Sequence, residues 1–320
     1  MFHVEMGDPN APVLLLIHGW PTSSIDWFEV ANQLSARFRV CALDFPGHGF
    51  SDKPQGWGYS LARDAELVEH YLSEVIGAES AVAVGHDRGD SVALIHAARC
   101  AEGRSAVRLE HLVLSNANIF LPMSNLTEVQ RRILDPVTGP EMLAALTPEQ
   151  MAEAMGASTF TPPRKAGDPE VEALAVTFAH ADGVKVLHET IQYLVERSKD
   201  EEKWLSALAE AAIPRTLIWG VYDTVSPPRV AAYVWHQYLM LNGLGNRLYL
   251  IPDANHYLQC DRPDAFVEVL LHALEPADDQ GPGPLKPELA APLFVDESRE
   301  RLPSAADVLQ GESPASSDRG

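Results

Sequence analysis

Short apolar runs alternate with segments of helical spacing over the first 118 residues of the chain. Continuous apolar runs of this length are typical of strands buried on both faces of a parallel sheet. The pattern therefore predicts an α/β protein with an open, mostly parallel, doubly wound sheet. The predicted strands are residues 13–18, 39–44, 81–85 and 111–115, and the predicted helices are residues 26–37, 60–76 and 88–99.

The alternation stops after Asn118 and resumes near residue 210. Residues 119–209 contain no strand pattern and are divided by Pro and Gly into several helical stretches. Strands are predicted again at residues 215–220 and 247–251, followed by a helix at 263–274. We therefore expect a core formed by residues 1–118 and 210–275, with residues 119–209 inserted as a helical cap. Such an insertion lies over the carboxyl ends of the strands, where open α/β sheets bind ligands.

Residues 276–320 have a different composition from the rest of the chain. They contain seven prolines, nine acidic residues and four basic residues, and almost no aromatic residues. Segments of this kind bury too little apolar surface to order themselves. The sequence predicts a poorly ordered acidic, Pro-rich tail without catalytic content.

Composition and charge narrow the possible partners. The 320 residues are 46% hydrophobic and carry a formal net charge of −21. This charge argues against nucleic acid and anionic membrane surfaces as partners. No apolar run approaches the ~18 residues of a membrane span. The three cysteines lie far apart without metal-type spacing, which favours a reducing cytoplasm. Monomer and homodimer both remain open.

Asp87 is the first candidate for chemistry. Residues 85–89, Gly-His-Asp-Arg-Gly, follow a predicted strand and open a predicted helix. Strand, tight turn and helix form the context of a nucleophile elbow, which normally carries serine at its centre. A carboxylate is nucleophilic without losing a proton, and it attacks saturated carbon. Asp87 therefore favours epoxides or alkyl halides over esters as substrates, and the flanking glycines argue against a simple helix cap.

Two further residues complete a candidate Asp–His–Asp triad. His256 lies on a loop between the last predicted strand and the last helix, and Asp223 follows the strand at 215–220. The chain order is nucleophile, acid and histidine, as in hydrolases with this elbow. Asp223 would hold the imidazole in the tautomer that a general base needs. A competing acid position after the strand ending at Ser115 holds asparagines, Asn116 and Asn118.

An anionic tetrahedral intermediate needs backbone N–H donors. Arg88 follows the nucleophile and would supply one donor. Trp20, in the turn after the first apolar run, would supply the other. The Trp20 side chain is also expected to line the substrate pocket.

Three motifs of the chain lie in its predicted turns. They are His18-Gly-Trp-Pro-Thr-Ser-Ser24, Asp44-Phe-Pro-Gly-His-Gly-Phe-Ser-Asp52 and Gly85-His-Asp-Arg-Gly89. These motifs resemble those of α/β-hydrolases of the epoxide hydrolase and haloalkane dehalogenase group, and the resemblance covers about residues 2–274. It implies an α/β-hydrolase fold with a cap, a small hydrophobic substrate, and no metal or organic cofactor.

The same resemblance implies a role for Tyr193. Epoxide hydrolases of this group donate a hydrogen bond to the epoxide oxygen from cap tyrosines, and Tyr193 matches one such position. It is the only tyrosine in residues 119–209, although two donors are usual. His180 and His188 are the candidates for the second donor. We therefore predict an epoxide hydrolase (EC 3.3.2.-) that forms an alkyl ester on Asp87 and hydrolyses it with water activated by His256.

Two alternatives remain. The first is a haloalkane or haloacid dehalogenase with the same triad. The resemblance would then require an Asn and a Trp as halide donors where the chain has Trp20 and Arg88, and haloacid enzymes carry an arginine where the chain has Ser91. The second is a catalytically silent hydrolase homologue that binds a ligand.

Overall fold

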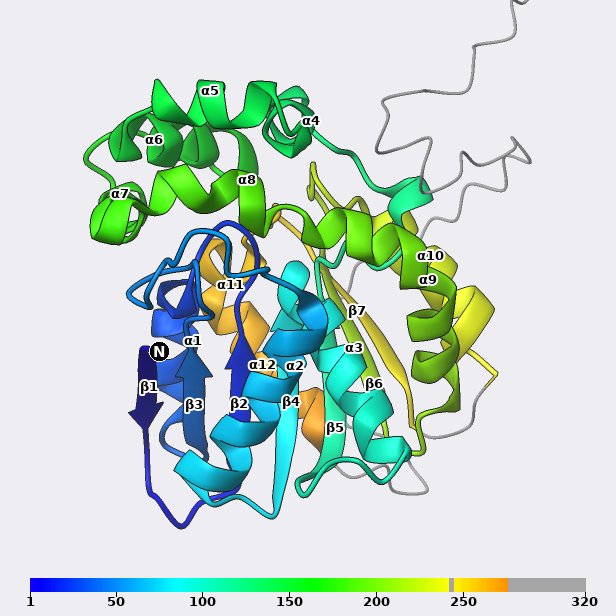
Figure 1. The fold of residues 1–320 in the computed structure, drawn as a ribbon. Coiled ribbons are helices and arrows are strands. Elements are labelled where there is room, and N and C mark those ends of the chain that lie inside the picture. Colours follow the sequence, from blue (N-terminus) through cyan, green and yellow to red (C-terminus); the bar gives the residue numbers. More distant parts are fainter. Residues whose placement is uncertain (242–244, 276–320) are drawn as a thin grey trace, which may run out of the picture.

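A single seven-stranded sheet organises the protein in the computed structural model, which describes residues 1–241 and 245–275 (Figure 1). The strand order is β1-β3-β2-β4-β5-β6-β7, with β1 antiparallel to β3 and every other neighbouring pair parallel. The predicted mostly parallel, doubly wound sheet is confirmed. The strands are β1 (His3–Met6), β2 (Val13–Ile17), β3 (Arg39–Leu43), β4 (Ser80–His86), β5 (Arg108–Ser115), β6 (Arg215–Gly220) and β7 (Arg247–Ile251). The predicted tail, residues 276–320, lies outside the described residues.

The continuous apolar strands follow from burial on both faces. In β2, Leu15 and Ile17 point into one hydrophobic cluster, while Leu14 and Leu16 point into the other. Because successive side chains of a strand point to opposite faces, a strand covered on both sides must be apolar throughout.

Two layers of helices cover the sheet (Figure 1). One face packs against α1 and α12, whose apolar residues join the cluster that contains Leu14 and Leu16. The other face packs against α2, α3, α9 and α10. These helices are α1 (Phe28–Leu34, after a 3₁₀ turn at Ser24–Trp27), α2 (Leu61–His70, continued by a π segment at Tyr71–Ile76), α3 (Arg88–Ala101), α9 (Tyr193–Glu210), α10 (Pro228–Val234, continued at Trp235–Leu239), α11 (Leu258–Asp261) and α12 (Pro263–Leu274).

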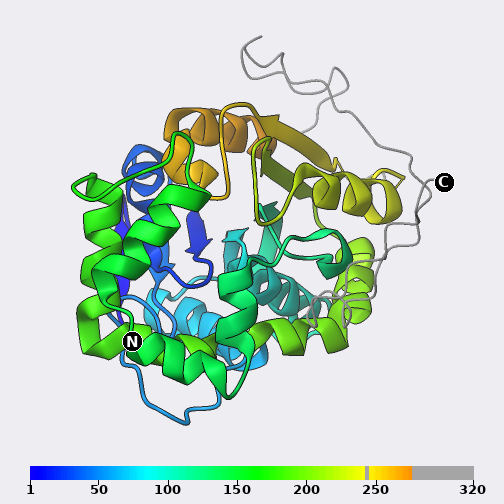
Figure 2. The ribbon, with the colours of Figure 1, turned by 90° about the horizontal axis from the view of Figure 1, so that it is seen from above.

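The segment between β5 and α9 consists of short helices. In Figure 1 they lie above the carboxyl ends of the central strands, and Figure 2 shows them curving around those ends. Capping boxes start two of the helices, since Thr127 pairs with Gln130 and Thr147 with Gln150. The elements are a 3₁₀ turn (Leu121–Met123), α4 (Glu128–Leu134), α5 (Thr138–Ala144), α6 (Pro148–Thr159), α7 (Pro169–Ala179), a further 3₁₀ stretch (His180–Val186) and α8 (Leu187–Thr190).

Helix α9 lies within the inserted stretch of sequence but packs along α3 of the sheet layer (Figure 1). The helices that overhang the strand ends therefore run from α4 to α8. Within residues 1–241 and 245–275, no helix is both long enough and apolar enough to cross a membrane.

Candidate active site

Asp87 occupies a strained turn between β4 and α3. Its backbone has φ 51° and ψ −115°, a conformation that L-residues rarely adopt. The two flanking glycines allow the turn to be this tight. A Cβ atom on Gly85 would lie 2.4 Å from Asp90 Oδ1, and one on Gly89 would lie 2.4 Å from the Ile17 carbonyl oxygen. The sequence thus fixes Asp87 at the carboxyl end of a central strand.

Both carboxylate oxygens of Asp87 accept hydrogen bonds in a buried setting. Oδ1 accepts the Trp20 backbone N–H at 2.8 Å, and Oδ2 accepts the Asn118 side-chain N–H at 3.0 Å. Burial raises the pKa of Asp87, while His256 and the backbone N–H groups of Trp20 and Arg88 oppose the rise. The carboxylate is therefore weakly solvated and has donors on each oxygen.

Trp20 connects the nucleophile turn to the overhanging helices. Its backbone follows Gly19, where an added Cβ would lie 2.7 Å from Asp87 Cβ, so glycine is needed for this close approach. Its indole Nε1 donates to Thr190 Oγ1 in α8 at 3.0 Å. The Trp20 backbone thus donates to Asp87, while the Trp20 side chain is bonded to the inserted segment.

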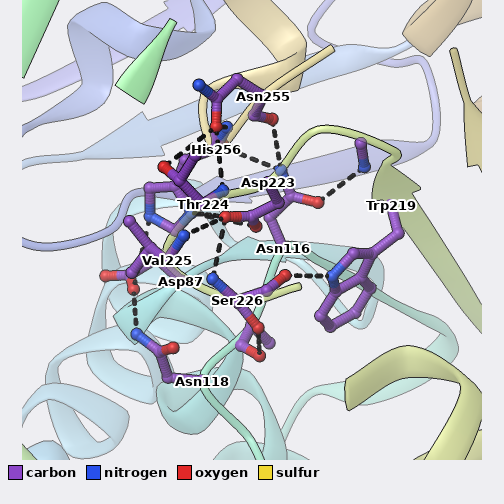
Figure 3. A network of polar contacts seen from close by, with 12 residues as sticks. Asp87, Asn116, Asn118, Trp219, Asp223, Thr224, Val225, Ser226, Asn255 and His256 are labelled. Carbon is purple, nitrogen blue, oxygen red and sulfur yellow. Dashed lines mark hydrogen bonds and ion pairs between the residues drawn. The ribbon is translucent and has the colours of Figure 1, made fainter. Parts of the chain in front are cut away.

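His256 and Asp223 lie next to each other beside Asp87 (Figure 3). His256 Nδ1 lies 3.2 and 3.1 Å from the two Asp223 oxygens, and its Nε2 lies 3.7 Å from Asp87 Oδ2. Asp223 Oδ1 also accepts the backbone N–H groups of Val225 and Ser226, each at 2.8 Å. Burial disfavours the imidazolium, yet the Asp223 carboxylate and then Asp87 raise the pKa of His256 overall.

Asn116 supports this arrangement from the end of β5. Its Nδ2 donates to the backbone oxygens of Asn255 and His256, each at 2.7 Å, and its Oδ1 accepts the Gly220 N–H at 2.8 Å (Figure 3). It thereby joins the end of β6 to the loop that carries His256. The sequence marked this position only as a place where an acid is missing.

Asn118 is a site residue that sequence reasoning did not assign. Its side chain is 2% exposed and reaches Asp87 Oδ2 (Figure 3). Within the described residues, its Oδ1 has no hydrogen-bond partner. The sequence signal that could have identified it is its place just after the strand that ends at Ser115, two residues beyond Asn116.

Tyr193 begins α9 and lies deep beside the nucleophile turn. It is 2% exposed, and its hydroxyl makes no hydrogen bond of normal geometry with the described residues. Burial raises the pKa of Tyr193 well above its usual range, the Asp87 charge adds to the rise, and the neighbouring Asn118 side chain opposes it. Tyr193 is therefore a protonated phenol close to Asp87 and Asn118.

The Arg88 side chain is bonded to Asp64 rather than to Asp87. Its guanidinium pairs with Asp64, and it lies 5.3 Å from the Phe45 ring centroid and 5.7 Å from that of Tyr193. Only its backbone serves Asp87.

The two histidines predicted as second donors lie elsewhere. His180 is exposed and packs edge-on against Phe50 at 5.5 Å, and His188 Nδ1 bonds the Lys185 carbonyl oxygen. Neither histidine lines the cleft that leads to His256, nor do Asp87, Asn118 and Tyr193, but those three interact with one another.

A cleft of about 280 Å³ opens between the inserted helices and the turn that carries Trp20. Its wall is mainly apolar and includes Val129, Met151, Met155 and Val225. Among the described residues that line it, His256 is the only one that could carry a charge near neutral pH. In the part of the chain that the structure describes, no group of three or more His, Cys, Asp and Glu side chains could hold a metal ion.

Comparisons with known proteins agree on the fold. Residues 12–263 match the family model described as "alpha/beta hydrolase fold". The chain is 30% identical to a putative hydrolase, LipZ, of Mycobacterium tuberculosis over 85% of this chain and 91% of that protein. It is also 30% identical to the human mesoderm-specific transcript homolog protein, over 83% and 79% of the two chains. Among solved structures, haloalkane dehalogenase DbeA of Bradyrhizobium elkani matches with a TM-score of 0.70, 22% identity, and coverage of 84% and 91%.

Proposed function

We propose that this chain, which belongs to the α/β-hydrolase fold family, is an epoxide hydrolase that uses Asp87 as its nucleophile. The observation that carries the proposal is the nucleophile itself. A carboxylate, rather than a hydroxyl, stands at the elbow, with Trp20 N–H on Oδ1 and His256 Nε2 3.7 Å from Oδ2. These groups suit a cycle in which an ester forms on one oxygen and is hydrolysed at the adjacent carbon.

In the first step, Asp87 Oδ2 attacks a ring carbon of the epoxide. The new C–O bond forms as the ring C–O bond breaks, and the electron pair goes to the departing oxygen. Tyr193 donates its hydroxyl proton to that oxygen. The raised pKa of Tyr193 keeps this proton in place before the reaction.

In the second step, His256 Nε2 takes a proton from water, whose oxygen attacks Asp87 Cγ. Negative charge develops on Oδ1, where the N–H groups of Trp20 and Arg88 stabilise it. The Cγ–Oδ2 bond then breaks, and the diol leaves with Oδ2 and a proton from His256. The proton of the new carboxyl group replaces the one that Tyr193 gave up.

The cleft supports a small, uncharged, hydrophobic substrate. Its wall is mainly apolar and offers no arginine or lysine for a carboxylate. Arg197 does reach Ser91, at 2.7 Å, but it is fully buried and also bonds the Ile119 carbonyl oxygen. A haloacid substrate is therefore disfavoured, and the charge of −21 disfavours nucleic acid and anionic membranes as partners.

A haloalkane dehalogenase is the second candidate, favoured by the likeness of folds. A departing halide needs N–H donors. The residues at the two halide-donor positions are Trp20 and Arg88, and both side chains already bond other groups. The Trp20 indole donates to Thr190, and the Arg88 guanidinium pairs with Asp64. Because neither side chain is free to bind a halide, an epoxide is the favoured substrate. The reaction needs no cofactor, and we propose a cytoplasmic enzyme that acts as a monomer or homodimer.

The test uses styrene oxide and 1-bromobutane with wild type, Asp87→Asn and His256→Gln. We expect diol formation by wild type, none by Asp87→Asn, and a mass adduct on the Asp87 peptide of His256→Gln. A single turnover in ¹⁸O-labelled water should place the label in Asp87 and leave the first diol unlabelled. Bromide release without diol formation would support the dehalogenase, while binding without any turnover would support a silent homologue.

A further inference from the structure

Asn118 holds the oxygen of Asp87 that reacts in the proposed cycle. Oδ1 faces the Trp20 N–H and becomes the ester carbonyl, so Oδ2 is the oxygen that is alkylated. The Asn118 amide donates to this same Oδ2 at 3.0 Å. The hydrogen bond from this donor weakens when Oδ2 forms a bond to carbon.

The weakening follows from the change in charge. A carboxylate oxygen is a strong, charged acceptor, and its hydrogen bonds are about twice as strong as neutral ones. An ester oxygen bonded to two carbons is neutral and accepts weakly. At the same moment, negative charge appears on the departing oxygen. The Asn118 amide therefore makes a stronger hydrogen bond if it donates to the departing oxygen instead of to Oδ2.

Tyr193 lies on the same side of the site. Its hydroxyl and Asn118 Oδ1 are both buried and, within residues 1–241 and 245–275, neither makes a hydrogen bond of normal geometry. The two side chains interact with each other, and both act on Asp87.

We propose that Asn118 is the second donor to the departing oxygen, beside Tyr193. It transfers a hydrogen bond from Asp87 Oδ2 to that oxygen and gives up no proton, while Tyr193 supplies the proton. This inference rests on the proposed function, and it concerns only the alkylation step. In ester hydrolysis, His256 protonates the departing Oδ2 and the N–H groups on Oδ1 stabilise the developing charge, so the role assigned to Asn118 ends with alkylation.

The experiment measures the two steps separately. In the His256→Gln background, adduct formation on Asp87 from styrene oxide is followed by rapid quench and intact mass. With His256 present, the decay of the adduct is followed after a single turnover. Asn118→Ala and the similarly sized Asn118→Leu should each slow adduct formation by about 10- to 100-fold and leave adduct decay unchanged. Asn32→Ala, an exposed change on α1, is the matched control.

Each outcome decides a different claim. If His256→Gln with intact Asn118 forms no adduct, the proposed function fails. If the adduct forms and Asn118→Ala does not slow it, only the role of Asn118 fails. Recovery of the rate in Asn118→Leu would show a packing role and overturn the inference, as would equal slowing of both steps.

Discussion

The Trp20 backbone N–H donates to Asp87 Oδ1 at 2.8 Å, although 67 positions separate the two residues in the sequence. The bond assigns different tasks to the two oxygens of one carboxylate. Oδ1 is fixed in the position where an ester carbonyl would need N–H donors, and Oδ2 remains on the side of His256. In the proposed cycle, this geometry distinguishes the oxygen that stays on Asp87 from the oxygen that leaves with the diol.

Asp223→Asn should lower turnover by about 10²- to 10⁴-fold. An amide can still accept one bond, but it stabilises the imidazolium less and permits the wrong imidazole tautomer. Adduct formation on Asp87 should continue, because His256 acts only in the second step. Steady-state rates together with trapped adduct measure both effects. Loss of adduct formation in a folded variant would contradict the assignment.

Thr190→Val should slow ester hydrolysis by about 3- to 10-fold. The change keeps the side-chain shape but removes the acceptor of the Trp20 indole N–H. Leaving the buried indole N–H unpaired costs about 1–3 kcal/mol. The Trp20 turn would recover part of this cost by shifting, and the shift would move its backbone N–H away from Asp87 Oδ1. Single-turnover decay of the adduct measures the effect, with the exposed Thr138→Val as control. An unchanged decay rate would show that the indole bond serves only packing.

Asp87→Gly should abolish turnover and stabilise the fold. Glycine adopts φ 51° without strain, and the substitution removes a carboxylate whose burial is unfavourable. We expect a gain of about 1–3 kcal/mol in the free energy of unfolding. Urea unfolding checks this value. Gly89→Ala should instead lower the free energy of unfolding, because its Cβ would collide with the Ile17 carbonyl oxygen.

Asp26 should make stability depend on pH. It is buried within the turn before α1 and accepts a hydrogen bond from Thr22, and burial raises its pKa to about 8. The folded protein therefore holds a proton that the unfolded chain releases near pH 4, the ordinary Asp range. The stabilisation is complete below about pH 4 and declines as pH rises toward 8, by at most about 1.4 kcal/mol per pH unit.

Asp26→Asn isolates this contribution. The amide mimics the protonated acid at every pH, so the variant should gain stability relative to wild type as pH rises from 5 to 8. Urea unfolding of both proteins at several pH values gives the difference. A constant difference across this range would mean that Asp26 keeps the same charge in the folded and unfolded chains.

Local patterns predicted the features that depend on local sequence. The strands were evident because apolar runs are required where helices cover both faces, and Asp87 was evident because Gly85 and Gly89 mark its turn. The short helix α10 was not predicted, since Val230–Val234 is apolar or aromatic throughout and shows no helical alternation. The roles of Asp87, Asp223, His256 and Tyr193 remain predictions that the geometry now makes specific.

The asparagines could not be predicted for a different reason. Asn116 bonds residues 104, 139 and 140 positions away, and Asn118 bonds Asp87 from the segment that follows the neighbouring strand β5. These partners meet only through sheet order, which no local pattern encodes. The inserted segment was likewise identified by its missing strands, but the packing of α9 on α3 depends on contacts between distant parts of the chain.

The hydrogen bonds by which Asn116 joins β6 to the His256 loop also bear on when the site is completed during synthesis. Asp87 follows β4, whereas His256 follows β7, the last strand among residues 1–241 and 245–275, and Asn116 needs both the end of β6 and the His256 loop. During synthesis the proposed nucleophile therefore emerges long before the proposed base. Under the proposed function, turnover would report that all seven of these strands have paired.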